Sequence, residues 1–402
     1  MKALEGIKVA DFTWYAAGPY VTRYLALQGA IVIRIESSTR IDRTRLNAPF
    51  KDDKVGVNRS GQFALFNPNK YSITLNLKDP RGLEIAKRLV VWSDVVAENF
   101  TAGTMEGFGL GYQELKKLKP EIIMLSSTNQ GQTGPNAKQA GFGLQLEALS
   151  GFVHISGWPD RAPVIHGGIN TDTVAARFGV VALLAALDYR RRTGKGQYID
   201  LAQYEAGLYF LAPLLLDFDV NGRVASKTGN RCSFAAPHGV YPCKGDDRWC
   251  AITVFNDEEW QAICECMGHL EWVKEGKFTT LLGRKEKEDE LDKLIAEWTS
   301  QFEAEKLAAM LQAKGVSAGV VKNAGDIYQD PQLAHRGQWK EIEHREIGNL
   351  KYDMPGYLLP KAPPQLDRPA PCLGEHNEYV CTQILGMEKK LVEQLAADGV
   401  LK

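Results

Sequence analysis

Short apolar, β-branched runs alternate with helical patterns along the first 130 residues. Apolar residues recur at helical spacing over residues 19–28 and 81–92, and Asp79 and Pro80 supply the cap and first-turn proline of the second helix. Strand, helix, strand in this order predicts a parallel, doubly wound sheet. We therefore expect an α/β fold with a large Rossmann-like domain. The predicted strands cover residues 7–12, 30–36, 71–77, 94–100 and 121–127.

The segments that follow these strands are the first places to expect ligand contacts. In doubly wound sheets the ligand crevice lies beyond the carboxyl ends of the strands, here at residues 13–19, 37–45 and 99–104. Glu36 stands where a dinucleotide-binding protein holds a ribose. Residues 16–18, however, offer one glycine where the G-x-G-x-x-G fingerprint needs three. The sequence therefore disfavours an NAD- or FAD-dependent enzyme.

A long apolar helical run begins at Asp172 and extends to residue 187. Three arginines and two glycines follow it, so that cations lie at the negative end of the helix dipole. The run is apolar nearly all round, which predicts a buried helix. A carboxylate in its first turn lies at a buried, electropositive end, as a carboxylate nucleophile requires. The alternative is that Asp172 only caps the helix.

The pattern changes near residue 219. Turn-rich segments lead to a predicted strand at residues 249–254 and to amphipathic helices over residues 257–269 and 288–312, and six prolines follow within residues 355–371. This proline-rich tail is expected to return across the first domain. We predict three parts: a large α/β domain at 1–218 that carries Asp172, a small α+β domain at 219–325, and a C-terminal segment at 326–402.

Composition narrows the class of protein. The chain has 402 residues, 44% of them hydrophobic and 24% charged, with a formal net charge of -1. These values predict a soluble globular protein without a nucleic-acid or membrane partner. No signal-peptide pattern is present at the start, so a cytoplasmic location is expected. Seven cysteines form no C-x-x-C pair, and Cys264, Cys266 and His269 make one incomplete cluster, so no metal site is predicted.

Motifs spread over the whole chain resemble those of the class III CoA-transferases, the family of formyl-CoA transferase and carnitine CoA-transferase. They include Ala17-Gly-Pro19, Glu98-Asn-Phe100, the Arg-Thr-Gly-Lys-Gly-Gln stretch at 192–197, and Leu373-Gly-Glu-His376. The resemblance implies an enzyme that moves CoA from an acyl-CoA donor, expected to be succinyl-CoA, to a free carboxylic acid. The CoA thioester is then the substrate, and no separate cofactor is expected.

The resemblance also implies roles for individual residues. In the family, the aspartate that opens the long helix is the nucleophile, which forms an aspartyl anhydride and then an aspartyl-CoA thioester; here that position is Asp172. The small-domain glycine loop that the family carries is not evident between Gly229 and Gly239. The family's CoA-contacting segments match Ala16, Ala17, Leu75, Asn76, Lys78, Asn99, Phe100 and Thr101.

Several basic residues of the family pattern are missing. Ser37, Thr101 and Gly107 occupy positions where basic residues are frequent. Lys78 is a plausible partner for a CoA phosphate. The lost charge is expected to come from nearby arginines, namely Arg40, Arg43 or Arg45.

Two alternatives to an active transferase follow from the same resemblance. α-Methylacyl-CoA racemase, a divergent branch, has a histidine in a Gly-His-Asp stretch where this chain has Phe142, and the nearest histidines are His154 and His166. A racemase-type epimerase would therefore lack its second acid/base group. A non-catalytic partner subunit of a heteromeric CoA-transferase would have no need of Asp172.

The resemblance further bears on assembly and on the acceptor. The family fold is an interlocked dimer, so we expect either a homodimer or a hetero-oligomer with a homologous subunit. Four aromatic residues suggest an aromatic-lined acceptor pocket of the kind expected in the succinyl-CoA:benzylsuccinate branch, although such residues more often pack in a core. They are Trp14, Tyr15, Phe142 and Trp158.

Overall fold

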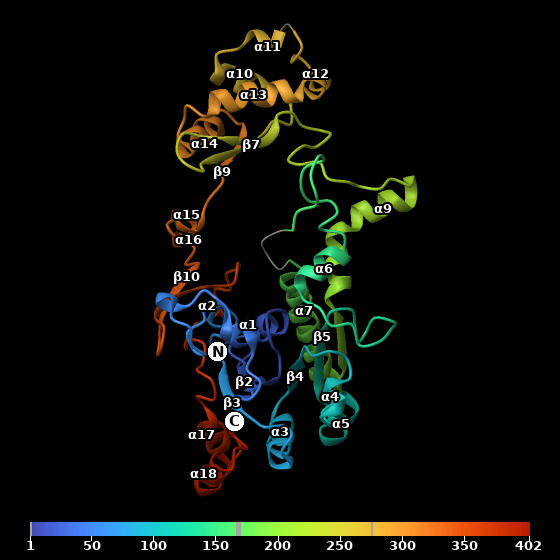
Figure 1. Cartoon of the computed structure of the whole chain (residues 1–402), viewed down its shortest axis with the longest axis vertical. Coiled ribbons are helices and arrows are strands. Elements are labelled where there is room, and N and C mark those ends of the chain that lie inside the picture. The colour runs from blue at the N-terminus through green and yellow to red at the C-terminus, as the bar shows by residue number, and fades with distance from the viewer. Residues whose placement is uncertain (1, 166–169, 275) are drawn as a thin grey trace. The chain divides into compact units, whose positions relative to one another are not determined.

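The computed structural model describes residues 2–165, 170–274 and 276–402. The described chain forms two compact units. Unit 1 comprises Met1–Phe152, His166–Arg223 and Ala334–Lys402, and unit 2 comprises Val153–Ile165 and Val224–Leu333. Figure 1 traces both units along the chain.

Unit 1 is built on a six-stranded sheet in the order β3-β2-β1-β4-β5-β6. Every pair of neighbouring strands is parallel, which confirms the predicted α/β class. The sixth strand was not among the five predicted from the pattern. The strands are β1 (Lys8–Asp11), β2 (Ile31–Glu36), β3 (Tyr71–Thr74), β4 (Val95–Glu98), β5 (Ile123–Thr128) and β6 (Tyr198–Ala202).

Helices cover both faces of this sheet (Figure 1). On one face, Val21 of α1 (Ala17–Leu27) and Leu183 of α7 (Asn170–Thr193) pack against the strands. On the other face, α3 (Pro80–Trp92) and α5 (Tyr112–Leu118) join the core through Leu89 and Leu115. Alternate strand residues serve the two faces because successive side chains of a strand point in opposite directions. Asp79 caps α3 by accepting a hydrogen bond from the Arg81 N–H, as predicted.

Helix α7 is buried along one face only, so the prediction of a helix buried all round is wrong for the single chain. Val181 is 64% exposed and Leu184 is 42% exposed, whereas Ala176 and Leu183 are buried. By length and mean hydropathy alone, the helix is of a kind that crosses membranes. Its buried face packs on β5, β6 and α1, as expected for a core helix of a doubly wound fold.

The remaining elements of unit 1 are short or lie near its C-terminus. Strands β10 (Trp339–His344) and β11 (Gly348–Asp353) form an antiparallel hairpin. The Asn76 N–H donates to the Val400 carbonyl, and Figure 1 shows the red C-terminal helices near β3. Other helices are α2 (Gly61–Phe66), α4 (Thr104–Gly107), α6 (Gly143–Leu149), α8 (Gln203–Leu208), α9 (Ala212–Asn221), α17 (Asn377–Tyr379) and α18 (Lys389–Ala397).

Unit 2 combines a three-stranded antiparallel sheet with helices around the buried Trp260. The helix predicted over residues 288–312 is two helices, because the backbone of Glu303 is extended. The strands are β7 (His238–Pro242), β8 (Trp249–Thr253) and β9 (Ser317–Val320). The helices are α10 (Asp257–Met267), α11 (Glu271–Lys274), α12 (Leu281–Glu286), α13 (Glu288–Thr299), α14 (Ala304–Ala313), α15 (Ala324–Tyr328) and α16 (Pro331–His335), whose last two residues belong to unit 1.

Candidate functional site

The residues expected to contact CoA follow the ends of three strands of the large sheet. Ala16 and Ala17 follow β1, residues 75–78 follow β3, and residues 99–101 follow β4. Carboxyl ends of parallel strands meet at one edge of a sheet, so these segments share that edge. Helix α7 leads into β6, which is parallel to β5, and therefore begins at the same edge. The fold thus brings the first turn of α7, with Asp172, to the edge that holds the expected CoA contacts.

The loop between β1 and α1 is held in a fixed conformation. Tyr15 has φ of +60°, in the left-handed region that non-glycine residues seldom adopt. Its N–H donates to the Asp42 carboxylate at 3.2 Å. The Asn99 side chain accepts from the Trp14 N–H at 2.6 Å and donates to the Trp14 carbonyl at 2.7 Å. Asn99, which is itself predicted to contact CoA, therefore orders the loop that leads to two other predicted CoA contacts, Ala16 and Ala17.

Buried ion pairs lie beneath this loop. Arg34 pairs with Asp42 and donates to the Thr13 carbonyl at 2.7 Å. Lys70 pairs with Asp11 at 3.0 Å, and both side chains are fully buried. Burial lowers the pKa of Lys70 to about 8, although Asp11 opposes the shift. These pairs tie β1, β2 and the β1–α1 loop into one rigid support.

Arg45 belongs to this support and has no exposed side-chain surface to offer a ligand. It is fully buried and pairs with Glu36 at 2.7 Å. Burial alone raises the pKa of Glu36, but Arg45 and Arg34 outweigh it and lower that pKa to about 2. The expectation that Arg45 supplies charge for CoA is therefore wrong, because its guanidinium already neutralises a buried carboxylate. Arg40 and Arg43 are exposed, and Arg40 lies over the Trp14 ring at 5.6 Å.

The other expected CoA residues differ in exposure. Leu75 is 1% exposed and joins the core of the sheet, so its side chain is structural. Lys78 and Thr101 are exposed, and Asn76 and Phe100 are half-buried. Phe100 packs edge-on against Trp14 with ring centroids 5.6 Å apart.

Asp172 lies in the first turn of α7, as predicted, and is 9% exposed. Burial, with a further contribution from Glu147, raises the pKa of Asp172 to about 7. A carboxyl group with this pKa is protonated in acid and becomes ionised only as the pH rises to neutrality and above. In its ionised form it has the basicity of a good nucleophile at a site shielded from water.

Two buried acids near this edge were not predicted to be site residues, although Glu98 belongs to the Glu98-Asn-Phe100 motif. Glu147 is fully buried on α6, and its Oε1 accepts from the Asn170 N–H at 2.7 Å. Glu98 ends β4, and its Oε2 accepts from the Phe100 N–H at 2.8 Å. Burial raises the pKa of Glu98 to about 7. The available signal for Glu147 was a lone acid within the apolar stretch between Lys138 and His154.

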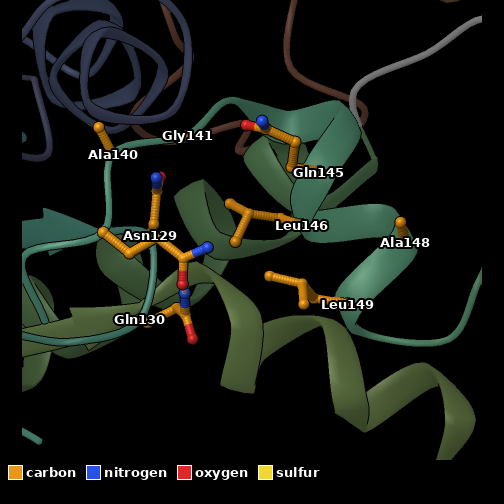
Figure 2. A pocket seen from close by; sticks show the side chains of 9 residues that line it. Asn129, Gln130, Ala140, Gly141, Gln145, Leu146, Ala148 and Leu149 are labelled. Atoms are coloured by element: carbon orange, nitrogen blue, oxygen red, sulfur yellow. Dashed lines mark hydrogen bonds between the residues drawn. The ribbon is translucent and has the colours of Figure 1, made fainter. Parts of the chain in front are cut away.

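A pocket of about 280 Å³ opens beside α6. Figure 2 shows Leu146 and Leu149 of α6 directed toward Asn129 and Gln130, which follow β5. Gln145 and Gln139 add two further carboxamides to the lining, and Gln130 Nε2 donates to Gln139 Oε1 at 2.8 Å. The described wall combines apolar residues with four carboxamides and carries no charged side chain, so it offers hydrogen bonds but no charge to a ligand.

The four aromatic residues are only partly brought together. Tyr15 and Phe142 meet edge-on with ring centroids 5.3 Å apart, both in unit 1. Trp158 belongs to unit 2, where it covers Gly229 and lines a separate pocket of about 730 Å³. His154 is exposed in unit 2, and His166 lies outside the described residues.

The pocket of about 730 Å³ in unit 2 is lined by charged residues of both signs. Arg231 extends into it and pairs with Asp289 and Asp292, each at 2.7 Å. The Tyr241 hydroxyl donates to Asp292 at 2.7 Å. Two carboxylates therefore already neutralise Arg231, although Lys293 also lines the pocket.

Residues 4–377 match the CoA-transferase family III. The chain belongs to this family. It is 34% identical to the succinyl-CoA–D-citramalate CoA-transferase of Chloroflexus aurantiacus, over 100% of this chain and 98% of that protein. It is 30% identical to the succinyl-CoA:glutarate CoA-transferase of Mus musculus, over 100% of this chain and 91% of that protein.

Two further similarities extend this result. A crystal structure of a CaiB/BaiF family protein from Brucella suis matches with a TM-score of 0.87 and 30% identity, over 95% of this chain and 99% of that one. The beta subunit of the succinyl-CoA–L-malate CoA-transferase of Chloroflexus aurantiacus is 30% identical, over 99% of this chain and 98% of that subunit. The protein is thus a class III CoA-transferase acting on acyl-CoA and carboxylic acids. Its relatives include succinyl-CoA-dependent enzymes and subunits of heteromers.

Proposed function

We propose that this CoA-transferase uses succinyl-CoA as donor and Asp172 as nucleophile. The observation that carries the proposal is the position of Asp172, buried in the first turn of α7 at the carboxyl edge of the sheet. The sequence likeness to succinyl-CoA-dependent transferases supports the donor. The alternative that Asp172 only caps α7 is less favoured, because it lies inside the described helix, which begins at Asn170.

The proposed reaction has four steps. The Asp172 carboxylate attacks the thioester carbonyl, the C–S bond breaks, and a succinyl-aspartyl anhydride and CoA thiolate form. The thiolate attacks the aspartyl carbonyl, releases succinate and leaves an aspartyl-CoA thioester. The acceptor carboxylate attacks that thioester and forms a new anhydride with Asp172 while thiolate leaves. The thiolate then attacks the acceptor carbonyl, which gives the product thioester and frees Asp172.

CoA would lie along the sheet edge in this proposal. Backbone near Ala16 and Ala17 and the side chains of Asn76 and Phe100 line its path. The exposed Lys78, Arg40 and Arg43 are the cations available for its phosphates. The division into a large domain at 1–218, a small domain at 219–325 and a C-terminal segment at 326–402 belongs to the same proposal.

The acceptor is proposed to be a short dicarboxylic acid. The relatives named above act on D-citramalate, glutarate and L-malate, all of this class. The benzylsuccinate branch stays a prediction that rests on aromatic residues such as Tyr15 and Phe142. Parallel assays with glutarate, citramalate, malate and benzylsuccinate separate the two acceptor classes.

Two other features support the proposal. Phe142 stands where the racemase branch has its histidine, so a second acid/base group is not provided at that position. A racemase would exchange the α-proton of a 2-methylacyl-CoA in deuterated water without any acceptor acid.

All seven cysteines are unpaired, which fits a reducing, cytoplasmic compartment.

The test is intact-protein mass spectrometry after mixing with succinyl-CoA, followed by hydroxylamine or borohydride trapping. We expect a CoA-dependent adduct that maps to Asp172 and is absent in Asp172→Ala. Asp188→Ala, at the solvent-facing end of the same helix, serves as the matched control and should keep the adduct. Failure of the wild-type protein to form an adduct with a panel of acyl-CoA donors would favour a non-catalytic partner subunit.

A second copy of the chain is proposed as the partner. Helix α9 has no buried residue in the described chain, yet it is rich in apolar side chains. Leu216 is 62%, Phe218 58% and Val220 75% exposed. Apolar patches of this kind usually mark an interface. A homodimer is therefore proposed, and a hetero-oligomer with a homologous subunit is the alternative.

A further inference from the structure

Helix α6 holds an acid that the four-step reaction leaves without a role. Glu147 is fully buried, which is rare for a carboxylate without a specific partner. Its Oε1 accepts from the Asn170 N–H at 2.7 Å, and its Oε2 has no hydrogen-bond partner within the described part of the chain. An unpaired carboxylate oxygen at a buried position is costly, so it points to a function.

The contact with Asn170 joins α6 to the start of α7. The first N–H groups of a helix have no partner within the helix, and Glu147 supplies one from a neighbouring element. Thr171 makes a second link through its hydroxyl and the Gly143 carbonyl, 3.4 Å apart. Residues 170 and 171 are thereby fixed on α6, directly before Asp172.

We infer that Glu147 is a positioning residue that fixes the first turn of α7 and presents a negative charge to the Asp172 carboxyl group. The inference rests on the proposed role of Asp172 as nucleophile. A neighbouring negative charge keeps the Asp172 carboxylate basic, so that it attacks a thioester carbonyl more readily. A more basic carboxylate is also a poorer leaving group when the anhydride is attacked. Burial, with this charge added to it, raises the pKa of Asp172, so the enzyme is expected to be inactive in mild acid.

Other titratable groups on the elements packed against α7 do not share this role. Within the described residues, Glu147 is the one charged group that contributes to the raised pKa of Asp172, after burial itself. The groups on α1, α8 and β6, which also pack against α7, are Tyr20, Arg23, Tyr24, Tyr204, Glu205, Tyr198 and Asp200.

The test compares Glu147→Gln with Glu205→Gln in the full-length enzyme. A glutamine oxygen still accepts from Asn170, so Glu147→Gln removes the charge and keeps the contact; Glu205 is an exposed acid on α8. Activity of the wild type should fall as pH drops below about 7, where Asp172 becomes protonated. In Glu147→Gln this acid limb of kcat/KM should move down by roughly one unit or more. In Glu205→Gln it should stay in place.

A second measurement is independent of activity. Carbodiimide with an amine labels protonated carboxyl groups, and peptide mapping gives the extent of labelling of Asp172 at each pH. The labelling midpoint should lie near pH 7 in wild type and lower in Glu147→Gln. An unchanged midpoint in Glu147→Gln would overturn the inference, even if the protein proved to use another nucleophile. Activity retained by Asp172→Ala would instead overturn the proposed function.

Glu147→Ala separates the contact from the charge. It removes both, so its acid limb should shift as in Glu147→Gln while its melting temperature falls further. We therefore expect Glu147→Gln to have a higher melting temperature than Glu147→Ala, and both variants to have the same shifted pH profile. An Ala variant that matches wild type in both respects would contradict the role of Glu147.

Discussion

Asp172 combines burial with a charge that the reaction needs. A carboxylate in a buried site is destabilising, because folding removes it from water. Its pKa rises from an ordinary 3.8 to about 7 for this reason, and the Glu147 charge adds to the effect. The site therefore holds a reactive group at the expense of stability above neutral pH, as functional sites often do.

Asp172→Asn should reveal this cost. The folded pKa lies above the unfolded one, so the carboxyl's favourable contribution is fully present below about pH 4 and is lost as pH rises through about 7. Asparagine carries no such penalty. We expect the variant to be inactive, yet to gain stability over wild type as pH rises from 5 to 8, by about 2 kcal/mol or more at pH 8. Chemical denaturation at both pH values measures the difference.

A suitable control is Asp188→Asn, on the same helix but exposed and paired with Arg191 and Arg192. Its stability difference from wild type should not grow with pH over the same interval. If the stability difference between Asp172→Asn and wild type also failed to grow with pH, the conclusion that the pKa of Asp172 is raised would be wrong.

At the residue scale, the sequence predicts those site residues that a local hydrophobic pattern or a family motif marks. Asp172 was found because it opens a long apolar run and matches a family position. Glu147 was missed because its significance depends on a contact with Asn170, 23 residues later, that no periodicity reports. Arg45 was misjudged for a related reason: its sequence neighbourhood resembles that of Arg40, but only the fold shows which arginine turns inward toward Glu36.

At the element scale, close packing of α3 against the turn after β3 supports the sheet edge at which CoA is proposed to bind. A Cβ built on Gly82 would lie 2.3 Å from the Asn76 carbonyl oxygen, a backbone atom that cannot move alone. Gly82→Ala should therefore displace residues 76–78, lower the melting temperature and raise KM for succinyl-CoA. Gly107→Ala, whose Cβ would meet nothing within 4 Å, is the matched control and should leave KM near wild type. Equal KM values for both variants would argue against this packing role.

The buried pair of Lys70 and Asp11 should matter far more than a surface pair. Lys70→Met leaves the Asp11 carboxylate buried without its cation, which costs about 3–5 kcal/mol in comparable cases. Lys117→Met breaks an exposed pair with Glu114 and should change the unfolding free energy little. Urea denaturation of both variants makes the comparison. A small effect of Lys70→Met would mean that the pair is dispensable for the support beneath the β1–α1 loop.

Elements with strong periodic patterns were predicted well, and the errors have physical causes. The five early strands lie where the β-branched runs predict them, within a few residues at each end. The apolar spacing of α13 continues into α14 closely enough to suggest one helix, but residues 300–303 lie outside both helices, and the backbone of Glu303 is extended. Strand β6 was overlooked because its five residues include Asp200 and follow the polar end of α7.

At the scale of the whole molecule, the parallel sheet explains why segments that are distant in the sequence lie at one edge. Residues 16, 76 and 99 each follow a strand, and residue 172 lies in the first turn of the helix that leads into β6, so all four lie at the carboxyl edge of the sheet. The sequence predicts that edge from alternating strands and helices. The sequence does not predict which apolar helix faces stay exposed in the single chain. An apolar helix face has the same sequence pattern whether it packs in the core or against a second chain.

That ambiguity leads to a prediction about assembly. The exposed apolar residues of α9, together with Val181 of α7, are expected to be covered by a second copy, so the wild type should have twice the 44.6 kDa mass of the chain in light scattering. Leu216→Asp combined with Phe218→Asp places two charges where apolar contacts are proposed and should shift the mass toward that of one chain. Leu391→Asp, an exposed leucine on α18, should leave the mass unchanged. A wild type of single-chain mass at micromolar concentration would contradict the dimer. It would leave the exposed faces of α7 and α9 to a homologous second subunit, which co-expression with such a subunit tests directly.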